Sequence, residues 1–240
     1  MTAPKRALCL LLTVSLLLSL SATGAAAKDD RLFFCGDTAA KKIALTFDDG
    51  PHPHQTDEIL SILSEYGIRA TFFVIGVNVE RYPEQIGSIL KAGCEIGSHT
   101  YWHKRLDNMS REEVLSELIR TEQAICEQYD YRIRLFRPPE GMCSEDMMWC
   151  AEQMSYRVVL WSLDTKDWAH TPSDSIARSV LNNVKGGDVI LMHDYIGRRS
   201  PTAAALRTLI PQLLAQGYEF VTVSELIGAD SLSIKSTNQF

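Results

Sequence analysis

Stretches typical of β-strands and of amphipathic helices alternate along most of this sequence, and that alternation restricts the fold more than any other feature. About seven short runs rich in apolar and β-branched residues predict strands at residues 42–47, 70–75, 94–98, 135–136, 157–163, 189–192 and 219–223. Apolar residues recur at helical spacing in residues 56–66, 83–92, 110–125, 146–154, 173–184 and 202–216. Repeated βα units of this length predict a parallel sheet covered by helices.

The length and composition predict one domain. The chain has 240 residues, of which 45% are hydrophobic, and this is enough for a single substantial core. Ser110 and Glu113 form a capping box at the start of the clearest helix. No repeat or linker interrupts residues 41–228, so we expect one catalytic domain there, preceded by a segment at 28–40 and followed by a tail at 229–240.

The N-terminus has the features of a secretory signal peptide at residues 1–27. Lys5 and Arg6 precede a leucine-rich run at residues 7–20, and three alanines at residues 25–27 offer a cleavage site. An uncleaved membrane anchor is the alternative, because no charge occurs between the basic start and this site. The strongly apolar core is short and only small residues follow it, which favours cleavage. We therefore expect a secreted or cell-surface protein.

The charge balance argues against a nucleic-acid partner. Removal of residues 1–27 takes away two basic residues and no acids, so the formal net charge changes from −6 to −8. A chain this acidic is repelled by phosphates. We expect a monomer with no nucleic-acid partner and, once the signal is cleaved, no stable membrane partner.

The cysteines do not predict a set of disulfides or a structural zinc site that would fix the fold. An odd number of cysteines follows the signal, namely Cys35, Cys94, Cys126, Cys143 and Cys150. None shows the close pairing of a structural zinc site. We interpret most of them as buried thiols that act as small hydrophobic groups. One disulfide remains an alternative, and the sequence does not assign its partners.

Two adjacent carboxylates follow the first strand of the predicted domain. The sequence TFDDG at residues 46–50 ends an apolar run and precedes Pro51, which predicts a strand leading into a tight turn. At the end of a strand both Asp48 and Asp49 can face one cavity, so that one binds a metal while the other handles a proton. A solvated Asp-Asp-Gly turn is the alternative for this motif alone.

Two histidines follow another predicted strand. His99 and His103 are four residues apart, and in a helical turn such side chains lie about 5–6 Å apart. Two imidazoles and one carboxylate form a three-ligand metal site that leaves coordination positions open. Two surface histidines would be the simpler interpretation of this pair in isolation.

Five motifs in a fixed order resemble one family. They are residues 46–50 (TFDDG), 98–103 (SHTYWH), 137–141 (RPPEG), 164–168 (DTKDW) and 191–193 (LMH). Together they resemble the NodB-type polysaccharide deacetylases of carbohydrate esterase family 4, over roughly residues 41–227. The resemblance implies a distorted seven-stranded (β/α) barrel; a doubly wound open sheet is the alternative that the βα pattern allows.

The resemblance assigns the metal ligands and the base. It implies that Asp49, His99 and His103 hold one divalent ion, Zn²⁺ first, with Co²⁺ or another divalent ion as alternatives. Asp48 matches the general base, and Arg137 matches the arginine that pairs with this base and orients it. A neighbouring cation also keeps such a carboxylate ionised.

The loop after the fourth strand departs from the family pattern. The backbone N–H of Glu140 matches the donor that stabilises an oxyanion, and Pro138 matches a substrate contact. The family most often has an aromatic residue, usually tyrosine, where this chain has Glu140. A backbone donor survives that change, so the departure affects substrate preference more than catalysis.

The last motifs assign the general acid and its surroundings. His193 matches the acid that protonates the leaving amine, and Asp164 matches the carboxylate that hydrogen-bonds this histidine and raises its pKa. Trp168 and Leu191 match the apolar walls that receive the acetyl methyl group.

The activity that follows is metal-dependent removal of N-acetyl groups from an extracellular N-acetylhexosamine polysaccharide, peptidoglycan or chitin-type oligomers. An O-acetyl esterase of xylan-type glycans would use the same site. A non-catalytic glycan-binding protein is the third alternative, but it predicts the loss of metal or acid–base residues, and all the matched positions are kept.

Overall fold

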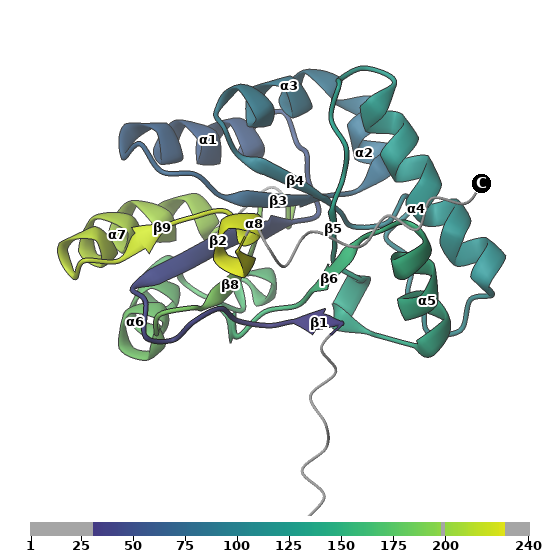
Figure 1. The fold of residues 1–240 in the computed structure, drawn as a ribbon. Coiled ribbons are helices and arrows are strands. Elements are labelled where there is room, and N and C mark those ends of the chain that lie inside the picture. Colours follow the sequence, from purple (N-terminus) through teal and green to yellow (C-terminus); the bar gives the residue numbers. More distant parts are fainter. Residues whose placement is uncertain (1–30, 198–199, 229–240) are drawn as a thin grey trace, which may run out of the picture.

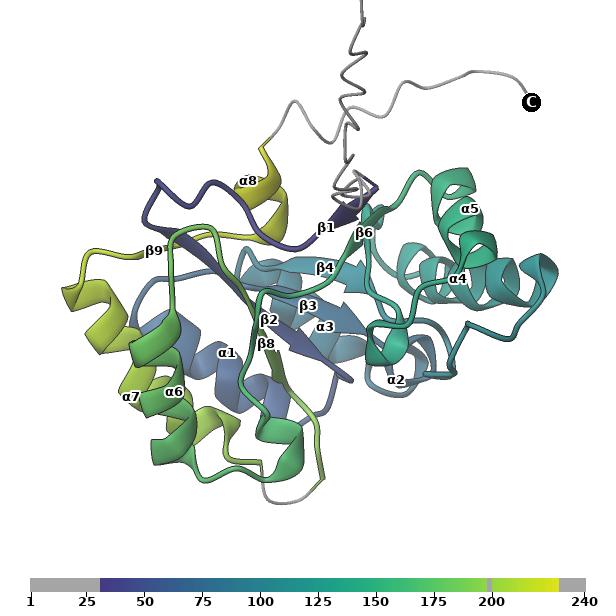
Figure 2. The ribbon, with the colours of Figure 1, turned by 90° about the horizontal axis from the view of Figure 1, so that it is seen from below.

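The computed structural model describes residues 31–197 and 200–228, and the ribbon of Figures 1 and 2 shows their arrangement. The predicted signal peptide at residues 1–27 and the tail at 229–240 lie outside the described residues. Within the described ranges, no helix is both long enough and apolar enough to cross a bilayer.

A single parallel sheet forms the centre of the molecule. Its strands follow the order β1-β6-β5-β4-β3-β2-β8-β7, and β9 pairs with the first residues of β2. Every ladder between these strands is parallel. The strands are β1 (Leu32–Phe33), β2 (Lys42–Asp48), β3 (Thr71–Val74), β4 (Glu95–Ser98), β5 (Leu135–Phe136), β6 (Arg157–Val159), β7 (Leu163–Asp164), β8 (Val189–His193) and β9 (Glu219–Phe220).

The predicted parallel α/β fold is confirmed, but the strand count differs from seven. The segment predicted as one strand at residues 157–163 is divided into β6 and β7, and β1 adds a short strand at one edge. Residue 223, predicted to end a strand, instead starts a helix, because Thr222 and Glu225 form a capping box there. The sheet curls into part of a barrel (Figure 1). Strands β1 and β7 are at the two ends of its strand order.

Helices surround the outside of the curved sheet (Figures 1 and 2). They contact one another in the order α6, α7, α1, α3, α2, α4, α5. They are α1 (Gln55–Glu65), α2 (Gly76–Arg81), α3 (Pro83–Lys91), α4 (Arg111–Cys126), α5 (Glu145–Gln153), α6 (Ser173–Asn183) and α7 (Thr202–Ala215). The short helix α8 (Val223–Ile227) instead packs within the curve of the sheet, and 3₁₀ turns occur at Pro139–Gly141 and Asp167–Ala169. The sequence analysis missed α2, α8 and both 3₁₀ turns, which are too short to show a helical period.

Strand β2 is the central element of the core. It pairs with β3, β8 and β9, and Ile43, Ala44, Leu45 and Phe47 are fully buried. A parallel strand covered on both faces requires such a continuous apolar run. Apart from Lys42 at its exposed start, the polar residues of β2 are Thr46 and Asp48, toward the C-terminal end where the strand leaves the core.

Two of the cysteines behave as small core residues, whereas Cys126 is exposed. Cys94 and Cys150 are buried, and burial raises the pKa of both thiols. No disulfide joins Cys35, Cys94, Cys126 or Cys150 in the described part of the chain.

Candidate metal and catalytic centre

A cavity of about 540 Å³ opens where the strands end. Parallel strands bring their C-terminal ends to one edge of the sheet, which is where such folds assemble sites. The pairing register of β2 and β8 places Asp48 directly beside His193. The lining residues lie in the last residues of β2, β7 and β8 or in the segments that follow β2, β4, β5, β6 and β7: Asp48, Asp49, His99, His103, Glu140, Trp161, Asp164, Trp168, Leu191 and His193.

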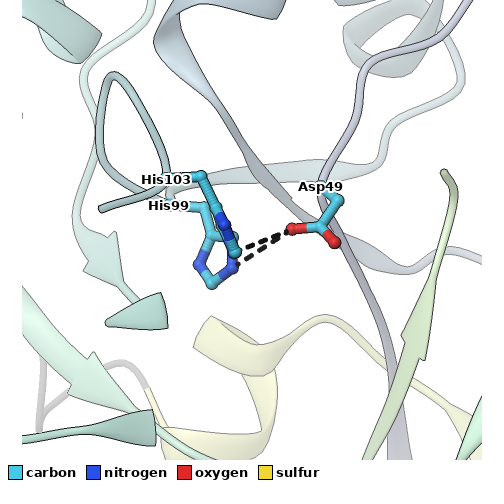
Figure 3. A group of neighbouring side chains, drawn as sticks. All are labelled: Asp49, His99 and His103. Atoms are coloured by element: carbon cyan, nitrogen blue, oxygen red, sulfur yellow. Dashed lines mark ion pairs between the residues drawn. The ribbon is translucent and has the colours of Figure 1, made fainter. Parts of the chain in front are cut away.

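Asp49, His99 and His103 meet at one side of this cavity (Figure 3). Oδ1 of Asp49 lies 3.5 Å from Nε2 of His99 and 3.2 Å from Nε2 of His103. One ligand atom from each residue lies within 4.8 Å of the other two. The structure therefore brings together the three residues that the sequence predicted as metal ligands.

The two histidines converge without a helical turn between them. Residues 99–103 form an irregular loop, and their ring centroids are 5.0 Å apart. Thr100 and His103 adopt left-handed backbone conformations with φ of 66° and 55°, and Asp49 does so with φ of 76°. Such conformations cost about 1–3 kcal/mol for residues other than glycine and are typical of functional sites.

A hydrogen bond fixes the orientation of the His99 ring. Its Nδ1 lies 2.7 Å from the carbonyl oxygen of Arg137, so Nδ1–H donates to that oxygen and Nε2 presents its lone pair to Asp49. Burial lowers the pKa of His99, although the charges of Asp48 and Asp49 oppose this change. The neutral imidazole is the form that binds a metal.

The residues present fit a divalent ion. Oδ1 of Asp49 is buried and has no hydrogen-bond partner in the described structure, although it faces two imidazole nitrogens. A buried carboxylate oxygen without a donor is costly unless another group satisfies it. Two imidazoles and a carboxylate are a ligand set suited to Zn²⁺, Co²⁺ and similar ions.

Asp48 forms a buried ion pair with Arg137. The Arg137 guanidinium is fully buried, and its Nη1 lies 2.7 Å from Oδ1 of Asp48 and 2.9 Å from the Thr46 hydroxyl. Its other nitrogens donate to the carbonyl oxygens of Val159 and Leu160. This network satisfies the buried cation and leaves Oδ2 of Asp48 facing His99 across 3.8 Å.

His193 is paired with Asp167, and the prediction that Asp164 fills this role is wrong. Nδ1 of His193 lies 2.8 Å from Oδ1 of Asp167, whose fully buried carboxylate also accepts hydrogen bonds from the His193 backbone, Thr202 and Trp168. Asp164 lines the cavity, but its Oδ1 accepts from the backbone N–H of Lys166. Lys166 has φ of 56°, and this reversal of the chain carries Asp167 beneath the histidine.

The environment of His193 favours its protonated form. Burial by itself would lower the pKa of this imidazole. The hydrogen bond to Asp167 and the nearby negative charges outweigh burial and raise the pKa to about 9. A proton donor at neutral pH is therefore held at the cavity wall.

Glu140, Trp161, Trp168 and Leu191 complete the lining of the cavity. Glu140 has φ of 56° in the first turn of a 3₁₀ helix, where backbone N–H groups lack helical partners. Pro138 was predicted to contact substrate, but it is buried and does not line the cavity; its carbonyl oxygen accepts from the Gly141 N–H.

Asp167, Trp161 and Asp194 are parts of the site that sequence reasoning missed. Oδ2 of Asp194 accepts from the Thr56 hydroxyl at 2.5 Å, and burial raises the pKa of this carboxyl to about 7. A Cβ on Gly50 would lie 2.0 Å from Oδ2 of Asp194, so only glycine fits after the two aspartates. Two signals were available: Asp167 lies inside the motif at residues 164–168, and Asp194 directly follows His193.

Comparisons with known proteins place these motifs in a family. The family profile described as polysaccharide deacetylase matches residues 36–159. A peptidoglycan-N-acetylglucosamine deacetylase from Bacillus cereus is 42% identical over 189 residues, which cover 78% of this chain and 88% of that protein.

Solved structures agree with this relationship. The crystal structure of a peptidoglycan N-acetylglucosamine deacetylase has a TM-score of 0.78 and 36% identity, and the match covers 82% of this chain and 92% of that one. A family 4 acetyl xylan esterase from Clostridium thermocellum, solved with a cobalt ion, has a TM-score of 0.73 and 33% identity, covering 78% of this chain and 91% of that one. This chain therefore belongs to the polysaccharide deacetylase family, carbohydrate esterase family 4, and is a metal-dependent hydrolase of carbon–nitrogen bonds.

Proposed function

We propose that this protein removes N-acetyl groups from N-acetylhexosamine units of an extracellular glycan, with peptidoglycan as the first substrate and chitin-type oligomers as the second. One observation carries the proposal. The three ligand atoms of Asp49, His99 and His103 lie within 4.8 Å of one another, and Asp48 and His193 line the same cavity. The relative from Bacillus cereus named for peptidoglycan supports the choice of substrate.

The metal side of the cavity prepares the nucleophile. We assign Zn²⁺ as the native ion and Co²⁺ as a substitute, held by Asp49, His99 and His103. When bound, such an ion supplies Lewis-acid chemistry, polarising a carbonyl and lowering the pKa of bound water to about 7. Asp48 then accepts the proton of the attacking water. Arg137 orients the Asp48 carboxylate, because its guanidinium donates to Oδ1 and leaves Oδ2 for the proton.

The opposite side of the cavity serves the leaving group. Collapse of the tetrahedral carbon breaks the carbon–nitrogen bond, and the departing amine nitrogen takes a proton from Nε2 of His193. Asp167 holds Nδ1 of this imidazole, so the ring is oriented and charged before the reaction. A positioned acid of this kind contributes about 10²–10⁴-fold in rate. We assign the Glu140 N–H as a donor to the developing oxyanion.

The apolar walls select the acyl group and the sugar. Leu191 is almost fully buried beneath the cavity and is suited to contact the acetyl methyl group. The rings of Trp161 and Trp168 line the same cavity and can pack against the apolar face of a pyranose.

Hydrolysis of O-acetyl groups on xylan-type glycans is the second candidate. The likeness to a family 4 acetyl xylan esterase favours it, since that protein has 33% identity over most of its length. An alkoxide leaves more readily than an amide nitrogen, so an esterase depends less on a strong acid. The raised pKa of His193 favours the amide substrate.

We also propose that residues 1–27 export the protein to the cell surface or the medium, where such glycans occur. Cell fractionation with an antibody against residues 41–228 tests this. Protein confined to the cytoplasm would contradict the proposal.

Acetate release by purified residues 28–240 tests the activity. We expect release from peptidoglycan and N-acetylated chitin oligomers to exceed release from acetylxylan. Full metal removal by a chelator should abolish the activity, and Zn²⁺ or Co²⁺ should restore it. Activity that persists without metal would contradict the metal site, whereas a preference for acetylxylan would select the esterase alternative.

A further inference from the structure

The two histidine ligands are held in different ways. The His99 ring is buried and anchored through Nδ1 to the Arg137 carbonyl oxygen. The His103 side chain is 37% exposed, and it follows an irregular backbone segment. The place of its Nε2 relative to His99 therefore depends on that segment, residues 100–102, which we call the ligand loop.

Helix α2 holds the ligand loop from one side. The backbone N–H groups of Gly76 and Val77, in its first turn, donate to the carbonyl oxygens of Thr100 and Tyr101, each at 3.0 Å. A Cβ on Gly76 would lie 2.5 Å from the Tyr101 ring. These contacts fix the two carbonyl groups of the loop but leave its N–H groups without partners from α2.

Helix α4 satisfies those N–H groups through one carboxylate. Oε2 of Glu117 accepts from the backbone N–H of Tyr101 at 2.9 Å and from that of Trp102 at 2.8 Å. Glu117 is 5% exposed. One turn further along α4, the guanidinium of Arg120 lies over the Tyr101 ring at 3.7 Å.

The buried position of Glu117 is unusual for an acid. It lies on the inner face of α4, between the buried residues Val114, Leu118 and Thr121. Glutamate is almost never fully buried unless it is paired. Here the two loop N–H groups are its partners, and hydrogen bonds to an ionised acceptor are roughly twice as strong as neutral ones.

We propose that Glu117 is a positioning residue for the metal centre, which fixes the ligand loop so that His103 faces His99 and Asp49. The inference rests on the proposed metal site. Without the carboxylate, the N–H groups of Tyr101 and Trp102 lose their acceptor, and the left-handed residues that flank them, Thr100 and His103, are free to relax. The spacing of the two imidazoles then changes although neither ligand is altered.

Glu117→Ala and Glu117→Gln test the proposal against matched changes at Glu122. Glu122 is also on α4, but its carboxylate accepts from the Tyr156 hydroxyl, away from the ligand loop. Three quantities are measured for each variant of residues 28–240. These are the thermal midpoint of the metal-free protein, the affinity for Zn²⁺ by competition with a chelator, and the visible absorption spectrum with saturating Co²⁺.

We expect Glu117→Ala to weaken Zn²⁺ binding by about 10–100-fold, the usual effect of removing a group that orients a metal ligand. Its Co²⁺ spectrum should differ from that of the wild type. Glu117→Gln keeps a weaker, neutral acceptor, so its affinity should lie between those of the wild type and the alanine variant. Both Glu122 variants should bind Zn²⁺ as the wild type does.

The outcomes separate this inference from the proposed function. A wild-type protein that binds no Zn²⁺ or Co²⁺ refutes the metal site itself. Wild-type binding combined with equal affinities and spectra for the Glu117 and Glu122 variants refutes only the role of Glu117. If Glu117→Ala does not fold, Glu117→Gln decides, since equal affinity of Glu117→Gln and Glu122→Gln overturns the inference.

Discussion

The floor and the rim of the cavity differ in how far their charged groups are exposed to water. The floor, formed by Asp48, His99 and Arg137, is almost completely buried, and its two charged groups, Asp48 and Arg137, are paired at 2.7 Å. At the rim, Glu140, Arg105 and Trp168 are each more than half exposed, and Arg105 bridges Glu140 at 3.5 Å and Asp107 at 2.9 Å.

This difference in exposure separates the residues suited to carry out the reaction from those suited to select the substrate. Charges that are shielded from water interact strongly and stay in place, which suits proton transfer at fixed atoms. Exposed ion pairs contribute about 0.2–1 kcal/mol or less and can be exchanged at little cost. We therefore expect substitutions in the floor to remove the reaction and substitutions at the rim to change the choice of substrate.

The largest effect is expected for Asp48→Asn in the floor. The amide cannot accept a proton from water, and the Arg137 guanidinium loses its buried counterion. We expect the deacetylation rate to fall by at least about 10²-fold. Asp188→Asn is the matched control, because Asp188 is a buried aspartate before β8 that accepts from Ser162 and Lys185 instead. A rate for Asp48→Asn equal to that of the control would remove Asp48 from the mechanism.

An intermediate effect, on pH dependence, is expected for Asp167→Asn. Asp167 raises the pKa of His193, which must be protonated to act as an acid, so activity should fall as the pH rises through about 9 in the wild type. Without the carboxylate, burial lowers this pKa, and the alkaline limb should move to lower pH. NMR titration of His193, together with pH profiles of kcat/KM, measures both effects.

Asp164→Asn is the control that decides between the two carboxylates. Its Oδ1 accepts from the Lys166 backbone, so the pKa of His193 should change little. A shift in this variant and none in Asp167→Asn would reverse the assignment.

The raised pKa of His193 also makes the stability of the folded protein depend on pH. The folded-state pKa is above the usual value of 6.5, so the His193–Asp167 pair contributes its full stabilisation below pH 6.5. That contribution is lost as the pH rises to about 9.

The smallest effect is expected at the rim. Glu140→Gln removes one exposed negative charge and leaves the backbone N–H in place, so the rate on an uncharged chitin oligomer should change only a few-fold, about 1 kcal/mol or less. The ratio of rates on anionic peptidoglycan and uncharged oligomers should rise, because a like charge is removed. Glu65→Gln, in an exposed pair with Arg207, is the control. A loss as large as that of Asp48→Asn would mean that the rim takes part in the chemistry.

Much of the fold could be predicted because its signals are local. The apolar run of β2, the Ser110–Glu113 capping box and the helical spacing of α1 each depend on neighbouring residues, and the structure shows all three. The short elements escaped prediction for the same reason. Helix α2 has six residues, which do not complete two turns, and β1 and β7 have two residues each.

The sequence by itself determined which side chains are available: two aspartates after a central strand, two histidines four apart, an arginine and a late histidine. Only the tertiary structure decided which of them act together, because hydrogen-bond partners distant in sequence are set by backbone turns. A left-handed Lys166 puts Asp167, and not Asp164, under His193. Glu117 reaches the ligand loop from another helix, since a buried acid can take only the donors that packing brings to it.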